Sequence, residues 1–289
     1  MKLRIKFRKF GAVRFLGHLD VMRFFQKAVR RAGIDIASTS GFSPHPVMSF
    51  ASALGVGTES NGEYLDIEVH SVTDSRDMAA RLNEASVPGI EVTSVKKLPP
   101  GARNAMASVA AAAYTVSFRE GREPMFPYPE KLDEFCRQEQ IWILKETKKG
   151  SREVDGKPGI FEWTVLENGE ISLFLDASSA GHIKPSLLME AFVSHYGESL
   201  QENALQMTRE ELYTDCLEEM QTCAGVRTVH GVRTVHGLGT VHGTQSIRQA
   251  QAIRETPIPQ EAQAAHSTRA FIPLDSIGTE IVGEKPYEP

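Results

Sequence analysis

Two periodic patterns open the chain and predict a strand followed by a helix. Residues 2–8 alternate between apolar and basic side chains, which is typical of a half-buried strand with one basic face. In residues 17–32, apolar side chains recur every three or four positions and Arg and Lys gather on the opposite side. This spacing predicts an amphipathic helix, and Gly33 is of the residue type that usually ends one.

Similar patterns continue through the chain and predict a sheet with helices. Further strands are expected at 47–54, 63–70 and 90–97, with a second helix at 72–84. This order of elements is the ferredoxin-like split βαβ plan. A related series follows a proline-rich linker, so the predicted fold class is α+β, with two tandem ferredoxin-like (split βαβ) halves followed by a C-terminal tail.

Changes in composition divide the chain into three expected regions. Residues 1–98 form a basic N-terminal ferredoxin-like half, and residues 104–215 form the second ferredoxin-like half. Residues 221–289 form a low-complexity tail. The tail repeats Gly-Val-Arg-Thr-Val-His at 225–230 and 231–236, followed by a degenerate third copy. Gln, Ala, Thr and Pro dominate the rest of the tail, which predicts disorder.

Composition narrows the protein class. The 289 residues are 41% hydrophobic, enough to build a core over most of the length. No apolar run reaches the length of a membrane span and no apolar signal region follows the basic N-terminus, so we expect a cytoplasmic protein with no membrane partner. The three cysteines are widely spaced and form neither a CxxC pair nor a CxxxCxxC triplet. We therefore expect no metal site or cofactor in this chain.

Positive charge is concentrated at the start of the chain. The net charge is -5, yet the first fifty residues hold ten Lys or Arg against two Asp. Such a localised surplus is typical of a surface that contacts RNA or an acidic protein face. The alternative is that the two halves neutralise each other across an internal interface.

A loop rich in Gly, Pro and Ser follows the predicted helix. Pro44 and Pro46 both fix φ and lack a backbone donor, so they hold His45 in a stiff, extended frame. Such a loop is either a recognition corner or a structural corner with a satisfied histidine. Because no catalytic partner for His45 is evident, we favour recognition.

Histidines also permit an enzymatic interpretation. If the fold brought His18 and His45 together, they could cleave RNA by general acid–base chemistry. Asp20 lies only two positions from His18, so on a helix the two would not face each other. Asp20 would instead pair with Arg23 or cap the helix start.

Two carboxylates precede and begin the next predicted strand. Glu59 and Glu63 could bind a metal or orient a cationic side chain. The simpler expectation is an ion pair with one of the nearby basic residues, which are Arg14, Arg23 and Arg30.

Several motifs resemble the radical SAM-associated (radical SAM-linked) protein family of the DUF2344 type. They are Arg-Phe-Leu-Gly-His-Leu-Asp at 14–20, Arg-Arg-Ala-Gly at 30–33, Ser-Gly-Phe-Ser-Pro-His-Pro at 40–46 and Gly-Thr-Glu-Ser at 57–60. The resemblance implies an accessory module for a radical SAM protein encoded separately. That partner, and not this chain, would carry the iron–sulfur cluster, S-adenosylmethionine and, in B12-binding cases, cobalamin.

The leading hypothesis is a non-catalytic binding module that presents RNA or docks the partner through a basic N-terminal surface. The alternatives are a metal-independent endoribonuclease that uses His18 and His45, and an adaptor that binds protein only. No catalytic residue is assigned. The candidate binding residues are Arg14, His18, Asp20, Arg23, Lys27, Arg30, Arg31, Ser40, Phe42, Ser43, His45, Glu59, Ser60 and Glu63.

Overall fold

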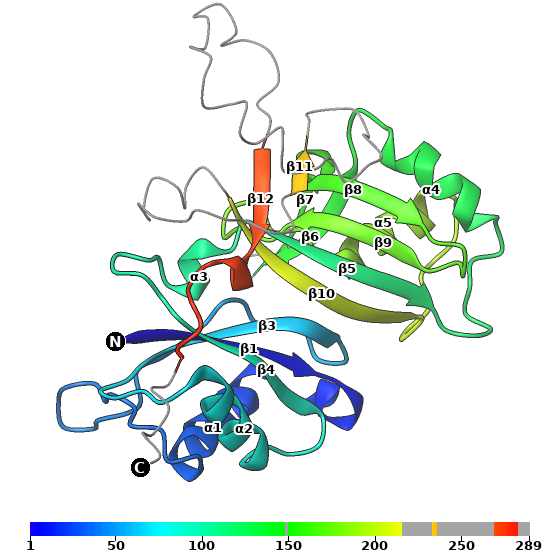
Figure 1. The fold of residues 1–289 in the computed structure, drawn as a ribbon. Coiled ribbons are helices and arrows are strands. Elements are labelled where there is room, and N and C mark those ends of the chain that lie inside the picture. The colour runs from blue at the N-terminus through cyan, green and yellow to red at the C-terminus, as the bar shows by residue number, and fades with distance from the viewer. Residues whose placement is uncertain (148–149, 216–232, 236–268, 283–289) are drawn as a thin grey trace, which may run out of the picture.

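A mixed sheet runs through the whole molecule (Figure 1). The computed structural model describes residues 1–147, 150–215, 233–235 and 269–282. Within these ranges it contains a 10-stranded sheet and a separate two-stranded hairpin. Helices pack on the sheet at both ends, so the predicted α+β class is confirmed.

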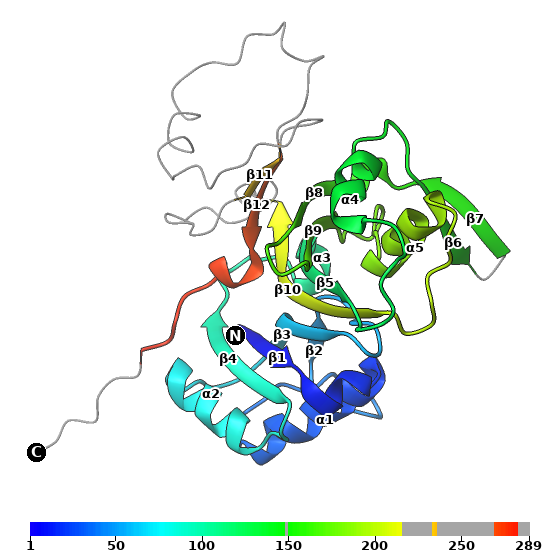
Figure 2. The same ribbon diagram turned by 90° about the vertical axis from the view of Figure 1, so that its right-hand side faces the viewer.

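The first half places two helices on one face of its strands (Figure 2). Its strands pair in the order β4-β1-β3, with β2 on the far edge of β3, and every pair is antiparallel. The elements are β1 (Lys2–Lys9), η1 (Gly11–Phe15), α1 (His18–Arg31), β2 (Met48–Phe50), β3 (Glu59–Glu68), α2 (Ser75–Glu84) and β4 (Ile90–Lys97).

The second half has the corresponding order, β10-β5-β9-β8, again antiparallel throughout. The hairpin β6–β7 lies between α4 and β8 in the sequence, and its two strands pair only with each other in the described residues. The elements are α3 (Ala105–Ser108), β5 (Ala111–Phe118), α4 (Tyr128–Cys136), β6 (Trp142–Thr147), β7 (Gly150–Asp155), η2 (Lys157–Gly159), β8 (Ile160–Val165), β9 (Ile171–Asp176), α5 (Pro185–His195) and β10 (Leu205–Asp215).

Apolar side chains of the first half pack between its helices and its strands. Leu3, Ile5 and Phe7 alternate along β1 and are fully buried. They pack against the apolar face of α1, where the ring of Phe25 lies 4.6 Å from that of Phe7. The period of two in the strand and of 3.6 in the helix therefore places both apolar faces in one core.

The two halves share one short parallel contact between β3 and β10. Glu59 pairs with Thr208 and Ser60 pairs with Arg209, after which the strands separate. Beyond this contact, β2 takes the edge of β3 and a C-terminal strand takes the edge of β10. Gly62 sits where the strands part, and a Cβ added there would lie 2.8 Å from the Glu210 carbonyl oxygen. Only glycine permits this approach.

The prediction of a disordered tail is wrong for residues 269–282. Strand β12 (Arg269–Pro273) pairs with β10, and η4 (Leu274–Ser276) follows it. Phe271 and Leu274 are fully buried. Burial of these two apolar side chains offsets the entropy that is lost when the segment becomes ordered. Of the hexapeptide repeats, only β11 (Arg233–Val235), which pairs with β12, lies within the described residues.

We predict that Gly62→Ala destabilises the protein by about 1–3 kcal/mol, because the new methyl group meets backbone of the other half that cannot move alone. Urea unfolding measures the change. Gly55→Ala is the matched control, since its Cβ would meet only Thr58 Oγ1, at 3.4 Å. Equal unfolding midpoints for the two variants would contradict the prediction.

We predict that the Cys136 thiol does not react with alkylating reagents in the native protein. Burial raises the pKa of its thiol to about 12, so only about one thiol in 10,000 is ionised at pH 8. Because an unfolded cysteine ionises near pH 8.5, the contribution of this thiol to stability is lost as pH rises from about 8.5 towards 12. Peptide mapping after iodoacetamide treatment should show Cys136 alkylated in guanidinium and unmodified without it. Rapid native labelling would contradict this.

Candidate functional site

The start of α1 brings together one group of the predicted binding residues. His18 opens the helix and lines a small hollow of about 10 Å³, space for roughly one water molecule. Glu63 lies on its wall, together with Lys9 and Ser52. Apolar side chains complete the lining, and the ring of Phe50 meets that of His18 edge-on at 5.3 Å.

Lys9 is a buried cation that the sequence analysis missed. Its ammonium group donates to the backbone oxygens of Arg14, at 3.1 Å, and Leu16, at 2.8 Å. It thereby ties η1 to the sheet. Burial lowers the pKa of Lys9, while the charge of Glu63 acts in the opposite direction. A signal existed, because Lys9 continues the period-two face of the apolar residues before it.

Glu63 forms a two-pronged ion pair with Arg209 from the other half. The two contacts measure 2.8 and 2.6 Å, and the residues are only 5% and 1% exposed. Although burial alone would lower the pKa of Arg209, the charge of Glu63 raises it, so the guanidinium stays ionised. Ser60 is also buried and donates from Oγ to the Arg209 backbone oxygen at 3.1 Å.

One of the two carboxylates forms the ion pair expected from the sequence. Glu59 accepts from Arg14 at 3.1 Å, as predicted, and also from the Gly11 backbone amide. Glu63 instead pairs with Arg209 of the other half. Arg209 reaches it because β10 runs beside β3, a neighbour that local sequence patterns do not reveal.

The basic face of β1 is not a solvent-exposed phosphate patch. Arg4 is fully buried and pairs with Asp66 through contacts of 2.8 and 3.0 Å. Lys6 reaches Glu211 of the second half at 2.6 Å. The alternative interpretation, neutralisation between the two halves, therefore holds for Lys6, whereas Arg4 is neutralised within its own half by Asp66.

The outer face of α1 holds the remaining predicted cations. Arg23, Lys27 and Arg30 are exposed. Arg23 pairs with Asp20 at 3.6 Å, as expected. Among the described residues, no carboxylate lies within ion-pair distance of Lys27 or Arg30. These two side chains are the free part of the basic surplus.

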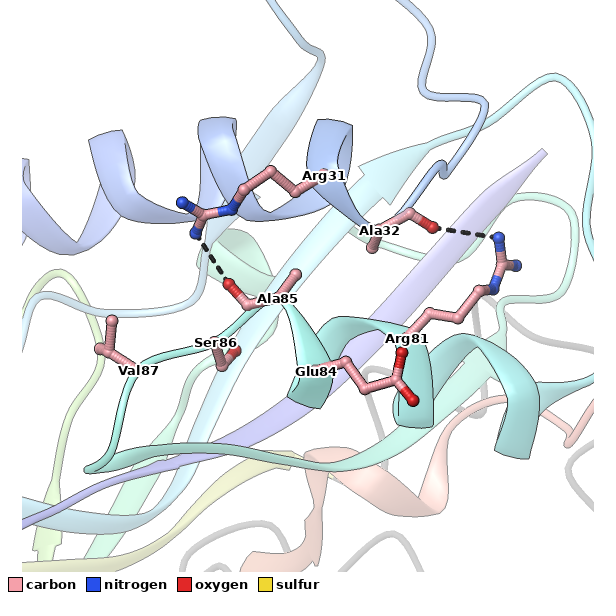
Figure 3. Close-up of a pocket in the computed structure, with 7 residues that line it drawn as sticks. All are labelled: Arg31, Ala32, Arg81, Glu84, Ala85, Ser86 and Val87. Carbon is pink, nitrogen blue, oxygen red and sulfur yellow. Dashed lines mark hydrogen bonds between the residues drawn. The ribbon is translucent and has the colours of Figure 1, made fainter.

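Arg31 has a structural role at the end of α1. Figure 3 shows Arg31 donating to the Ala85 carbonyl at the end of α2, at 2.7 Å, while Arg81 of α2 donates back to the Ala32 carbonyl at 3.1 Å. The two side chains border a groove of about 590 Å³. Each arginine donates a hydrogen bond to a carbonyl that has no partner within the neighbouring helix. The two bonds join the C-terminal ends of α1 and α2.

The glycine- and proline-rich loop closes on itself. The backbone amide of Thr39 donates to the His45 carbonyl at 2.9 Å, and the His45 ring nitrogen Nδ1 lies 3.1 Å from Thr39 Oγ1. Ser40, Phe42 and Ser43 are exposed, with Phe42 at the tip.

The two histidines of the nuclease hypothesis lie in different places. His18 packs on Phe50, the last residue of β2, whereas His45 belongs to the loop that precedes β2. No contact between the two rings is present in the described part of the chain.

Apolar side chains are exposed beside the hollow. Phe15 is 60% exposed, Leu19 59% and Val56 65%. Arg14 lies over the Phe15 ring, 4.9 Å from its centroid, and its carbonyl accepts from the Gly57 amide, which ties the loop of Val56 to η1. We call Phe15, Leu19 and Val56 the α1 patch; sequence periodicity could not find it, because η1 and the loop of Val56 are irregular.

We predict that the buried pair Glu63–Arg209 is strongly coupled. Removing either partner leaves a buried charge uncompensated, so Glu63→Gln and Arg209→Met should each lower the unfolding free energy by about 3–5 kcal/mol. The double variant should cost clearly less than the sum of the two. Chemical denaturation of all four proteins measures this. The exposed pair Asp20–Arg23 is the control and should couple by less than about 1 kcal/mol. Additive losses at Glu63 and Arg209 would contradict the prediction.

Comparison with known proteins gives a match to a family model. In the parts that the structure describes, no helix is both long and apolar enough to cross a bilayer. Residues 2–185 match the family model DUF2344, described as an uncharacterized protein conserved in bacteria. No curated protein matches the sequence.

Proposed function

Because the chain belongs to the DUF2344 family, we propose that it is a non-catalytic accessory module of a radical SAM enzyme system, which docks onto its partner through the α1 patch. The observation that carries the proposal is the exposure of three large apolar side chains around the start of α1. Exposed apolar side chains that gather in one place are typical of protein–protein contact sites.

The charges around the patch suit a protein partner better than a nucleic acid. Arg14 and Arg23 flank the apolar side chains, but each is already paired with a carboxylate of this chain. The local field is therefore weak, and the apolar surface supplies most of the available binding energy. A partner face of apolar residues with a few acidic ones complements it.

The radical chemistry belongs to the partner in this proposal. The partner, a radical SAM protein encoded separately, would carry the iron–sulfur cluster, S-adenosylmethionine and, in B12-binding cases, cobalamin. This chain would supply position, holding the partner or its substrate in place. The closed loop around His45, with Phe42 at its tip, would serve as a second recognition corner.

RNA presentation is the second candidate, and one observation favours it. Lys27 and Arg30 point outward from α1 with no carboxylate near them in the described residues, so they are available to phosphate oxygens. Two cations make a small footprint, which predicts weak, strongly salt-dependent binding.

We further infer that the chain consists of two related ferredoxin-like halves. The strand orders β4-β1-β3-β2 and β10-β5-β9-β8 support this, since each places its last strand beside its first and its third between first and second. The hairpin β6–β7 would then be an insertion in the second copy.

The docking proposal predicts that Phe15→Ser combined with Leu19→Ser weakens retention of the co-expressed radical SAM protein on the tagged chain by at least about tenfold, because both anchors lose their apolar contact. Met125→Ser is the matched control, since Met125 is exposed on the second half. Titration by surface-immobilised binding measures the change. Unchanged affinity in the double variant would contradict the α1 patch as the docking site.

The RNA candidate makes a separate prediction. Lys27→Glu combined with Arg30→Glu should abolish retention on immobilised RNA at low salt, whereas Lys2→Glu should leave most of it, because Lys2 already pairs with Glu68 at 3.7 Å. Lack of retention by the unaltered protein at low salt would eliminate RNA presentation and leave protein docking as the function.

A further inference from the structure

The C-terminal segment 269–282 lies in an extended track along the second half. Its first residues pair with the free edge of β10, Phe271 with Asp215 and Pro273 with Tyr213. The Phe271 side chain is fully buried against Phe174 and Tyr213, in a cluster separate from the core that contains the buried residues of α4 and α5. Arg269 lies over the Phe271 ring, 4.9 Å from its centroid.

The same segment then crosses to the first half (Figure 1). Lys96 of β4 donates to Asp275 at 2.9 Å, and Lys97 exchanges two backbone hydrogen bonds with Thr279. At the far end, the Ile281 amide donates to Ser75 Oγ at the start of α2. The track therefore spans β10, β4 and α2, and the segment connects the two halves.

Strand pairing on both of its edges holds the segment, since β12 pairs with β10 on one side and with β11 on the other. The end of β10 and the start of β12 pair directly, an arrangement that a hairpin normally closes with two to five residues. Here residues 216–268 intervene in the sequence. The described contacts that hold the segment are strand pairing to β10 and β11, four buried apolar side chains and hydrogen bonds to both halves.

The segment also has the composition of a peptide ligand. Phe271, Ile272, Leu274 and Ile277 are its buried anchors, within eight residues. Gly278 takes a positive φ of 105°, and a Cβ there would lie 2.8 Å from the Lys97 carbonyl oxygen, so a glycine lets the chain press against β4. Main-chain pairing to a sheet edge with alternate side chains in pockets is the β-augmentation mode of peptide recognition.

We propose that the track formed by the edges of β10 and β11, the end of β4 and the start of α2 is a peptide-binding site, and that residues 269–282 occupy it as a tethered and exchangeable ligand. The ligand class is an extended peptide with an aromatic anchor followed by aliphatic anchors and a glycine. This goes beyond the docking proposed for the α1 patch, since the two surfaces share none of their residues. It makes the contact between the two halves adjustable by occupancy of the track.

Exchange in a nicked protein tests the proposal. A protease site introduced between Thr244 and Gln245 allows the folded full chain to be cut once, and a fluorescent synthetic peptide of residues 269–282 is then added in excess. We expect the labelled peptide to replace the cut segment and to co-elute with the protein in size exclusion. Because the peptide replaces the segment, the track need not remain empty for the experiment to work.

Variant peptides identify the anchors. The peptide with Phe271→Asp and Leu274→Asp should incorporate at least about tenfold less, since it would place two carboxylates in apolar pockets. The peptide with Val282→Asp is the control, because Val282 is exposed and its change should leave incorporation unaltered. Incorporation of the unaltered peptide at the level of the double variant, or no incorporation by the nicked protein, would overturn the proposal. Neither result depends on the fate of the α1 patch.

Discussion

The ion pair between Glu63 and Arg209 is the interaction on which the arrangement of the two halves depends. Both side chains are buried at the only parallel strand contact of the sheet in the described residues, where β3 meets β10 for two residue pairs. So short a contact contributes few backbone hydrogen bonds. Charged groups fix its register instead, because a shift by one residue would leave both charges buried without partners.

Polar contacts around this pair extend the same constraint. Lys6 and the Tyr64 hydroxyl both bind Glu211, while Asn61 binds Glu210. Tyr64 is consequently held in its neutral form, since burial and the charge of Glu211 raise its pKa. Gly62 lets the two chains approach closely enough for all these bonds to form. Polar complementarity thus specifies which residues of the two halves meet at this interface.

Local patterns in the sequence predicted the elements and not their long-range neighbours. The alternation of β1 and the spacing of α1 gave both elements nearly to the residue, because each pattern reflects burial within one half. The same alternation suggested that Arg4 and Lys6 face solvent, which is wrong. Whether the polar side of a strand faces water or other parts of the protein depends on residues 62 or 205 positions away, and periodicity carries no such information.

In the candidate site, too, the sequence predicted contacts between residues that are close in the chain and not those between distant ones. Ion pairs between neighbours in sequence, such as Asp20 with Arg23, follow from helical spacing. Arg209 was missed because a basic residue in a late strand looks like any surface cation until its neighbour is known. The basic residues of the first half therefore fall into two groups that composition could not separate. Most bind other groups of this protein, whereas Lys27 and Arg30 remain exposed on α1.

Because β10 supplies the partners of Lys6 and Glu63, the part of the chain that matches the family cannot be cut out as an independent unit. The family match ends at residue 185, and a fragment ending there would lack Arg209 and Glu211. Glu63 and Lys6 would keep their places without partners, and the edges of β3 and β5 would be left unpaired. Such a fragment would combine uncompensated charge with unpaired strand edges, and both features favour aggregation. Boundaries drawn from sequence similarity alone are therefore the wrong ones for isolating this protein.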